Sequence, residues 1–169
     1  AVATAQLARL AAVLRETHAD VREQILRLRS STSPSQQSFP AALRHYLDGF
    51  ASNYAIGAKL TIAPGLCVEQ LPPETQMQLF RIVQEVLSNA RKHSGARSVA
   101  VTVAADDGKL SLWIADDGCG FEPGAAGNGH HLGLRTMTER AAELGGSLHI
   151  ESAPGAGTRV GVEVPWKER

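Results

Sequence analysis

The chain has 169 residues, enough for one domain of ordinary size or for a domain with an additional segment. Its 17 Lys and Arg residues balance 17 Asp and Glu residues, so overall charge does not favour nucleic acid or an anionic membrane as the partner. The two cysteines, Cys67 and Cys119, lie far apart, which predicts neither a disulfide framework nor a zinc site and is typical of a reducing cytoplasm.

Residues 1–30 form the first predicted element, a helix that contains neither Gly nor Pro. Apolar residues recur along it every seven positions, at Leu7, Leu14, Val21 and Leu28. This spacing is typical of a helix that packs against partner helices. One helix cannot bury such a stripe alone, so we expect a helical bundle completed by other segments or by a second subunit. The polar residues 31–38 predict a linker, and the main domain is expected at residues 39–169.

The main domain is predicted to begin with a helix, because Ser38 precedes Pro40 in a pattern that favours a helix start. Its apolar face would carry Leu43, Leu47, Phe50 and Tyr54. Gly57 is expected to end this helix, and a short strand is expected at residues 59–63.

The strongest helical pattern in the chain covers residues 74–93, and Ser94-Gly95 is predicted to end it. Its expected buried face consists of Leu79, Ile82, Val83, Val86, Leu87 and Ala90. Two alternating runs follow at residues 98–104 and 110–115, and the Asp107-Gly108 pair between them predicts a β-hairpin.

The remaining pattern predicts one more helix, at residues 134–144, and two final strands at 148–152 and 159–164. Strands paired by hairpins, with helices that do not alternate strictly with them, are typical of an α+β fold. We therefore predict a two-layer α/β sandwich, in which helices cover a mixed sheet.

Four polar residues share one arc of the helix predicted at 74–93, beside its apolar stripe, namely Glu85, Asn89, Lys92 and His93. Amide and carboxylate oxygens are hard ligands that suit Mg²⁺, whereas Lys and His can face phosphate oxygens. The arc is typical of a solvated helix flank or of a phosphate and metal site, and its spacing alone does not decide between them.

A second signal, Asp116-Asp117-Gly118-Cys119-Gly120, follows a predicted strand directly. The Asp116 carboxylate could accept a hydrogen bond from the exocyclic amine of adenine, and the glycines would allow close backbone approach to a flat ligand. An ordinary Asp-Gly turn is the alternative.

Two further glycine-rich segments complete the set. Residues 127–134 precede a predicted helix, which indicates either an anion site beneath a mobile lid or a simple surface loop. Residues 155–158 are by themselves typical of a tight hairpin turn. The adjacent His130-His131 pair is a poor metal-ligand pair.

As an ordered set, the four segments resemble the GHKL ATPase superfamily, with residues 85–93 similar to its N box and residues 116–120, 129–137 and 155–158 similar to its glycine boxes. The phrases at residues 89–94, 133–140 and 144–146 resemble histidine kinases of the nitrate-sensor-like subfamily most closely. Residues 1–30 are similar to the second helix of that group's dimerisation domain.

The resemblance implies roles for individual residues. Asp116 would hold the adenine amine, with Thr158 near the adenine, and Asn89 would ligate Mg²⁺. Glu85 would help at the metal or the phosphates, although matching residues in hydrolysing relatives activate water. The other implied nucleotide-binding residues are Lys92, His93, Gly118, Gly120, Gly129, Gly133 and Leu134, and residues 122–133 would form the ATP lid.

The resemblance also implies the function. The chain would be the ATP- and Mg²⁺-dependent catalytic domain of a sensor histidine kinase, passing the γ-phosphoryl group to a histidine and then to a response regulator. The full protein would dimerise through the helical bundle, and this domain would contact no nucleic acid. His18 lies in the second-helix segment and no acidic residue follows it directly, so we interpret it as a surface residue and expect the phosphoacceptor to be absent from this chain.

Two alternatives stay open. One is a serine kinase of the same superfamily that opposes a sigma factor, and the other is a nucleotide-binding interaction module without chemistry. Because the chain begins at Ala1 and not at Met, we interpret it as the cytoplasmic part of a longer protein, with a membrane anchor upstream left open.

Overall fold

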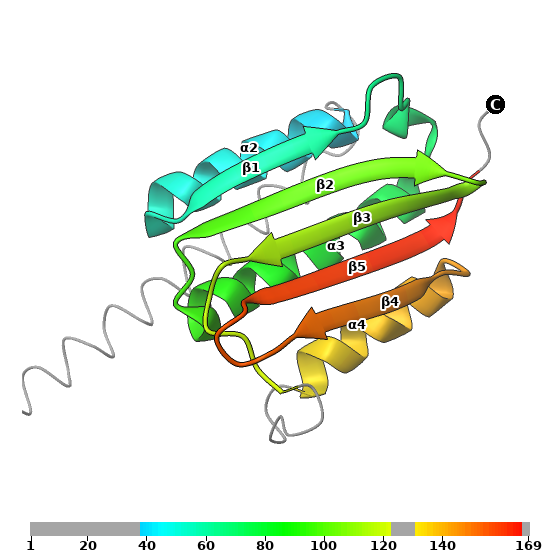
Figure 1. Cartoon of the computed structure of the whole chain (residues 1–169). Helices are drawn as coiled ribbons and strands as arrows, with labels where there is room; N and C mark the ends of the chain where they lie inside the picture. The colour runs from blue at the N-terminus through cyan, green and yellow to red at the C-terminus, as the bar shows by residue number, and fades with distance from the viewer. Residues whose placement is uncertain (1–37, 123–130, 167–169) are drawn as a thin grey trace, which may run out of the picture.

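The computed structural model describes residues 38–122 and 131–166, which form a sheet and a layer of helices (Figure 1). The helix predicted at residues 1–30 lies outside the described residues, and so does the linker predicted at 31–38, apart from Ser38. Among the helices described, none has the length and the apolar character that crossing a membrane requires.

Helix α2, Phe39–Tyr54, begins after Ser38 as predicted, with Pro40 in its first turn. It ends earlier than predicted, because Ala55 adopts the left-handed conformation with φ 55° and stops the helix there. Gly57, expected as the helix stop, is instead the first residue of strand β1, Gly57–Ile62. Its N–H donates to the Arg97 carbonyl oxygen at 2.9 Å, so strand pairing and not helix termination determines its place.

Helix α3, Pro73–Asn89, follows a short 3₁₀ helix η1, Val68–Gln70. The predicted continuation to residue 93 exists, but as the π-helical turn η2, Ala90–Ser94, which Gly95 ends with a φ of 61°. All six residues predicted to form the buried face of this helix are buried.

Strands β2, Ser98–Asp106, and β3, Lys109–Asp116, form the predicted antiparallel hairpin. Asp107 and Gly108 join them with positive φ values of 47° and 73°, the geometry that a tight two-residue turn requires. Helix α4, His131–Glu143, then leads to strands β4, Ser147–Ser152, and β5, Thr158–Pro165.

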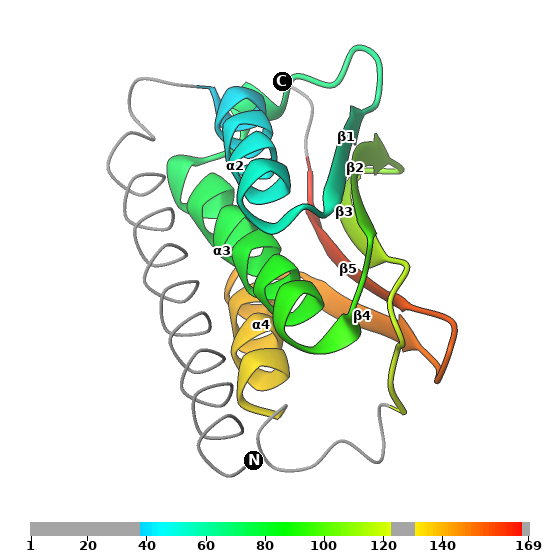
Figure 2. The same cartoon turned by 90° about the vertical axis from the view of Figure 1, so that its left-hand side faces the viewer.

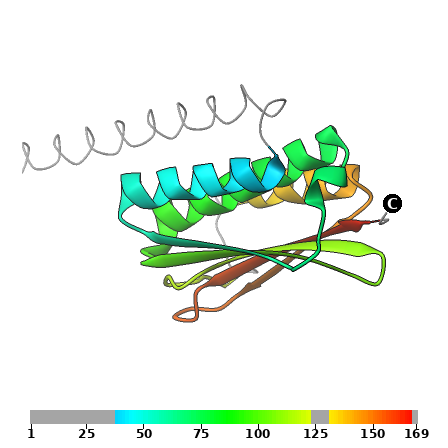
Figure 3. The ribbon, with the colours of Figure 1, turned by 90° about the horizontal axis from the view of Figure 1, so that it is seen from above.

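The sheet has the strand order β1-β2-β3-β5-β4, and only the β1–β2 pair is parallel. Helices α2, α3 and α4 cover one face of it, as the views from the side and from above show (Figures 2 and 3). The prediction of an α+β two-layer sandwich with a mixed sheet is therefore confirmed.

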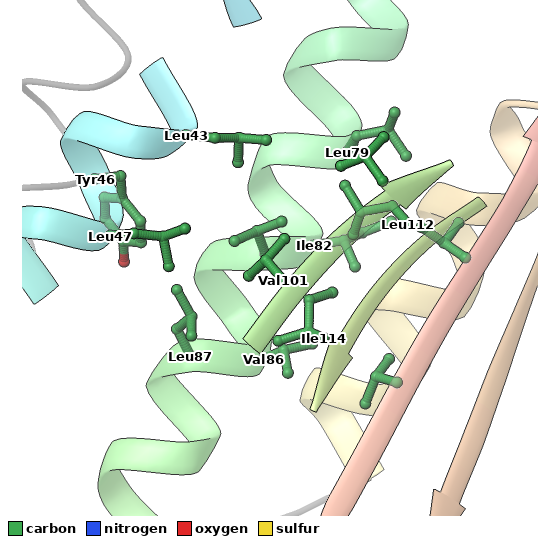
Figure 4. Packing of buried hydrophobic residues seen from close by; sticks show 14 of the residues in the cluster. Leu43, Tyr46, Leu47, Leu79, Ile82, Val86, Leu87, Val101, Leu112 and Ile114 are labelled. Atoms are coloured by element: carbon green, nitrogen blue, oxygen red, sulfur yellow. The ribbon is translucent and has the colours of Figure 1, made fainter. Parts of the chain in front are cut away.

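The core lies between these two layers (Figure 4). Leu43 and Leu47 of α2 and Ile82 of α3 pack toward Val101 and Leu112 of the central strands. Strands β2 and β3 are anchored in this way, and β5 joins the same core through its buried valines. The ends of β3 and β5 are therefore held in fixed positions beneath the helices.

Candidate functional site

A cavity of about 440 Å³ opens between the C-terminal end of α3, helix α4 and the ends of β3 and β5. Its size falls within the usual range for small-molecule sites. Apolar side chains form part of its wall, namely Val86, Ala90, Leu134, Met137 and Val160. Asn89, His93, Ser94, Asp116 and Thr158 add polar groups to the same lining. An apolar slot with a few convergent polar groups is suited to a flat heterocycle that carries polar substituents.

Asp116 is the last residue of β3, opposite Thr158 in the register with β5. Its Oδ1 accepts a hydrogen bond from the Gly118 N–H at 2.8 Å. Burial raises the pKa of this carboxyl, and the hydrogen bond from the Gly118 N–H offsets only part of that effect. A carboxylate held in an apolar cavity favours a ligand that donates a hydrogen bond to it.

Asp117 has a different role from Asp116, because its carboxylate is bound to protein groups at the start of β2. Its Oδ1 accepts hydrogen bonds from the N–H groups of Arg97 and Ser98, both at 2.8 Å, and its Oδ2 accepts one from the Ser98 hydroxyl at 2.9 Å. These bonds hold the pKa of Asp117 below its usual range. Asp117 therefore ties the segment after β3 to the start of β2, and so helps to position Asp116.

The π-helical turn η2 explains why His93 and Ser94 both line the cavity together with Asn89. In a π-helix the hydrogen bonds run from residue i to i+5, which brings Ser94 back beneath Asn89. The Ser94 hydroxyl donates to the Ala90 carbonyl oxygen at 2.7 Å and accepts from the Ala96 N–H at 3.1 Å. Such π-helical turns occur often at functional sites.

Ser94 also joins the helix end to the glycine segment that follows β3. Its carbonyl oxygen accepts a hydrogen bond from the Cys119 N–H at 2.7 Å. A Cβ atom at Gly118 would overlap the backbone and side chain of Ser94. The absence of a side chain at Gly118 thus serves contact between two protein segments, in addition to any approach to a ligand.

The turn between β4 and β5 packs on the same segment. The Gly155 N–H donates to the Cys119 carbonyl oxygen at 2.6 Å, and the Phe121 N–H donates to Ser152 Oγ at 2.9 Å. Gly120 has a φ of 61°, and a Cβ atom there would overlap the carbonyl oxygens of Ala153 and Gly157. The hairpin turn at residues 154–157 is therefore part of the site's framework.

Glu85 meets the start of α4. A Cβ atom at Gly133 would lie 2.6 Å from Glu85 Oε1 and 3.8 Å from Asn89 Nδ2, so α4 approaches α3 closely at this point. All four segments singled out in the sequence, around residues 89, 116, 133 and 155, consequently meet around one cavity.

Residues 74–168 match the family model described as histidine kinase-, DNA gyrase B-, and HSP90-like ATPase. This match covers more than half of the chain. The chain belongs to this ATPase family.

Two curated relatives show to which part of the ATPase family the chain is similar. The nitrate/nitrite sensor protein NarQ of Escherichia coli is 35% identical over 163 residues, which are 95% of this chain and 28% of that protein. The sensor histidine kinase YhcY of Bacillus subtilis is 37% identical over 114 residues, 68% of this chain and 30% of that protein. The chain spans less than a third of the length of either relative. It is an ATPase domain of the nitrate-sensor-like histidine kinases.

Solved structures agree with this fold. The histidine kinase domain of the blue-light activated histidine kinase from Erythrobacter litoralis EL346 matches with a TM-score of 0.61 and 24% identity, covering 76% of this chain and 61% of that one. The ATP binding domain of PrrB from Mycobacterium tuberculosis matches with a TM-score of 0.54 and 25% identity, covering 72% and 92% of the two chains.

Six of the residues predicted for nucleotide binding in this ATPase domain line the cavity, namely Asn89, His93, Asp116, Gly120, Leu134 and Thr158. Glu85, Gly118 and Gly133 lie just behind this lining, in the contacts given above. Lys92 is exposed beside it, and Gly129 lies outside the described residues.

Among the lining residues that sequence reasoning missed are Ser94, Phe121 and Met137. The sequence predicts Ser94 as the end of the helix and not as a lining residue, because an α-helical wheel turns it away from Asn89 and no local pattern indicates a π-helical turn. Met137 carries a signal that could have been used, since it lies three residues after Leu134 on the same helix face.

Proposed function

We propose that the chain is the catalytic domain of a sensor histidine kinase, which binds Mg·ATP and transfers its γ-phosphoryl group to a histidine. The observation that carries the proposal is the half-buried Asp116 carboxylate in an apolar cavity that also holds Asn89 and His93. ATP binding follows from membership of the ATPase family. The roles of individual residues are our own assignment.

In this proposal the adenine ring lies between the apolar side chains of the cavity. Its exocyclic amine donates a hydrogen bond to Asp116, beside Thr158. Guanine has a carbonyl oxygen in the corresponding place, which the carboxylate would repel, so the site favours ATP over GTP.

The phosphates would then extend toward the end of α3, where Asn89 and His93 line the cavity and Lys92 lies close by. Asn89, assisted by Glu85, supplies the oxygen ligands that suit Mg²⁺. Within the described residues, no three His, Cys, Asp or Glu side chains cluster as a metal site. We propose that the ion takes most of its ligands from phosphate and water. When bound, Mg²⁺ neutralises charge on the phosphates.

The protein's contribution to transfer is positioning and charge neutralisation, with little covalent chemistry of its own. Lys92 and His93 would hold the phosphate oxygens while the acceptor histidine approaches from a dimerisation bundle. The phosphoryl group would pass from that histidine to an aspartate of a response regulator. We place the domain on the cytoplasmic side of the full sensor, where ATP is available, and we propose residues 1–30 as the second helix of the bundle, 31–38 as the linker and 39–169 as the catalytic domain.

Isothermal titration of the chain with ATP and GTP, each with and without Mg²⁺, tests the binding site. We expect tighter binding of ATP than of GTP, strengthened by Mg²⁺. Replacing Asp116→Asn keeps the size of the side chain but presents a mixed donor and acceptor, and should weaken ATP binding by about 10-fold or more. Equal binding by the variant would contradict the proposed role of Asp116.

Phosphoryl transfer needs its own measurement. We would supply the chain with a separate dimerisation-domain helix that carries the acceptor histidine, together with γ-labelled ATP. Acid-labile, alkali-stable label on that helix is the expected result. Tight ATP binding without any label would support the interaction-module alternative, and label on serine would support the serine-kinase alternative.

A further inference from the structure

Helices α3 and α4 lie side by side on the same face of the sheet (Figure 2). Toward the start of α3, Arg140 Nη1 of α4 donates a hydrogen bond to Gln78 Oε1 at 3.0 Å. Gln78 Nε2 in turn donates to Glu143 Oε2, also of α4, at 3.3 Å. We call these three residues, Gln78, Arg140 and Glu143, the α3–α4 clamp. A charged donor makes the Arg140–Gln78 bond stronger than a neutral one.

The clamp lies at the opposite end of the helix pair from the cavity. Near the cavity, Gly133 of α4 faces Glu85 and Asn89 of α3, and a Cβ atom on Gly133 would lie 2.6 Å from Glu85 Oε1. The start of α4 thus meets the end of α3, and the end of α4 meets the start of α3, so the helices run antiparallel. Leu134 and Met137, which line the cavity, lie between these two contacts.

Arg140 does not line the cavity, but through this arrangement it can affect the shape of the cavity indirectly. A helix held at one end only can tilt, and a tilt of α4 would displace Leu134 and Met137 from the cavity wall. Displacements of about 1 Å at a binding site are enough to change ligand affinity. The clamp restrains that tilt at the end of α4 that lies away from the ligand.

We infer that Arg140 is a positioning residue: through Gln78 it holds α4 against α3, so that Leu134 and Met137 keep the cavity closed around the nucleotide. The inference rests on the proposed nucleotide site. Arg140 would thus affect the affinity for the ligand without contacting the ligand itself.

The chain offers a matched control on the same helix. Arg135 forms an ion pair with Glu139 at 2.7 Å, both side chains being largely exposed at 78% and 56%, and the pair lies within α4. Such exposed pairs contribute little. Arg135→Met therefore removes the same chemical group as Arg140→Met and leaves the contact between α3 and α4 intact.

The test is the dissociation constant for Mg·ATP of the chain and its variants, with the melting temperature measured in parallel. We expect Arg140→Met to raise the dissociation constant by about three- to tenfold, and Arg135→Met to leave it within about twofold. Gln78→Leu should have the same effect as Arg140→Met, and the double variant should be no weaker than either single variant. Arg140→Lys keeps a charged donor for Gln78 Oε1 and should recover part of the affinity.

A purely structural role would lower the melting temperature of the Arg140 and Gln78 variants and leave their ATP affinity, measured well below that temperature, equal to that of the unaltered chain. That result, or equal affinity of Arg140→Met and Arg135→Met, overturns the inference while the proposed function stands. Absence of ATP binding by the unaltered chain overturns the proposed function, and the inference with it. If Arg140→Met does not fold, the dissociation constants of Arg140→Lys and Gln78→Leu for Mg·ATP are compared instead. Weaker binding by Gln78→Leu than by Arg140→Lys supports the inference, and binding by Gln78→Leu equal to that of the unaltered chain overturns it.

Discussion

Asp116 and Asp117 are neighbours in the chain, yet their carboxylates lie in opposite environments. Burial raises the pKa of Asp116, whereas hydrogen bonds from Ser98 and Arg97 lower that of Asp117. The first carboxylate faces the cavity and the second fastens the backbone that carries it. One residue is therefore suited to ligand recognition and the other to positioning, a difference that two identical side chains owe entirely to their surroundings.

This difference predicts the pH dependence of binding. As the pH falls, Asp116 is protonated earlier than an ordinary aspartate, and its protonated form accepts the adenine amine poorly. The hydrogen bonds of Asp117 stabilise the fold above its usual pKa and are lost only when the pH falls through its lowered value. We expect nucleotide affinity to decrease on acidification before the melting temperature does, in titrations from about pH 7.5 downward.

Adenosine should be titrated alongside ATP, because it carries no phosphate that titrates in this range. Asp117→Asn is the control, since an amide oxygen can still accept from the N–H groups of Arg97 and Ser98. Because the Asp117 charge contributes to the raised pKa of Asp116, the binding of this variant should decrease at a slightly lower pH than that of the unaltered chain. A loss of affinity and of fold at one common pH would contradict the assignment.

At the scale of elements, the site depends on contacts between segment ends. The π-helical turn η2 brings Ser94 against Gly118, and Cys119 bonds to Ser94 on one side and to Gly155 on the other. The end of α3, the segment after β3 and the turn between β4 and β5 therefore behave as one connected unit. A change in any of these contacts should move Asp116.

Gly118→Ala tests this connection. The new Cβ atom would overlap the backbone of Ser94, which cannot move as a flexible side chain can. We expect a loss of about 1–3 kcal/mol in the free energy of unfolding and weaker ATP binding. Urea unfolding and calorimetric titration measure the two effects.

Gly57→Ala is the matched control for this substitution. Its Cβ atom would lie 3.6 Å from the Arg97 carbonyl oxygen, an ordinary contact, at a φ that any residue can adopt. It should leave both stability and binding nearly unchanged. If Gly118→Ala behaved like Gly57→Ala, contact with Ser94 would not explain the glycine.

At the scale of the whole molecule, the buried core of the described residues extends from Phe39 to Trp166. Helices α2 and α3 and the central strands β2 and β3 share it (Figure 4). The cavity opens at the edge of this core. The described residues of this folded unit lie within the range 39–169 that we propose as the catalytic domain.

A chain shortened to begin at Ser38 tests this boundary. Because it retains the whole described core, we expect it to unfold cooperatively and to bind ATP with a dissociation constant within about twofold of the original. Thermal unfolding and calorimetry provide the measurements. A large loss of affinity would show instead that residues 1–37 belong to the nucleotide-binding unit.

Local patterns by themselves determined most of the elements. The apolar spacing of residues 79–90 predicted the buried face of α3, and Asp107-Gly108 predicted the hairpin, because both signals act between near neighbours in the chain. The end of α2 was wrong by two residues, since a helix can end at any residue that adopts the left-handed conformation, and Ala55 does so here.

Only the tertiary structure decided which of these elements meet. The order β3-β5-β4 places Asp116 opposite Thr158, and the packing of α4 on α3 brings Gly133 to Glu85. These contacts join residues far apart in the chain, so no local period encodes them. Ser94 and Arg140 acquire their roles in the same way, the first through a π-helical turn and the second through a partner on another helix. Sequence determined the chemistry available, and packing determined where it acts.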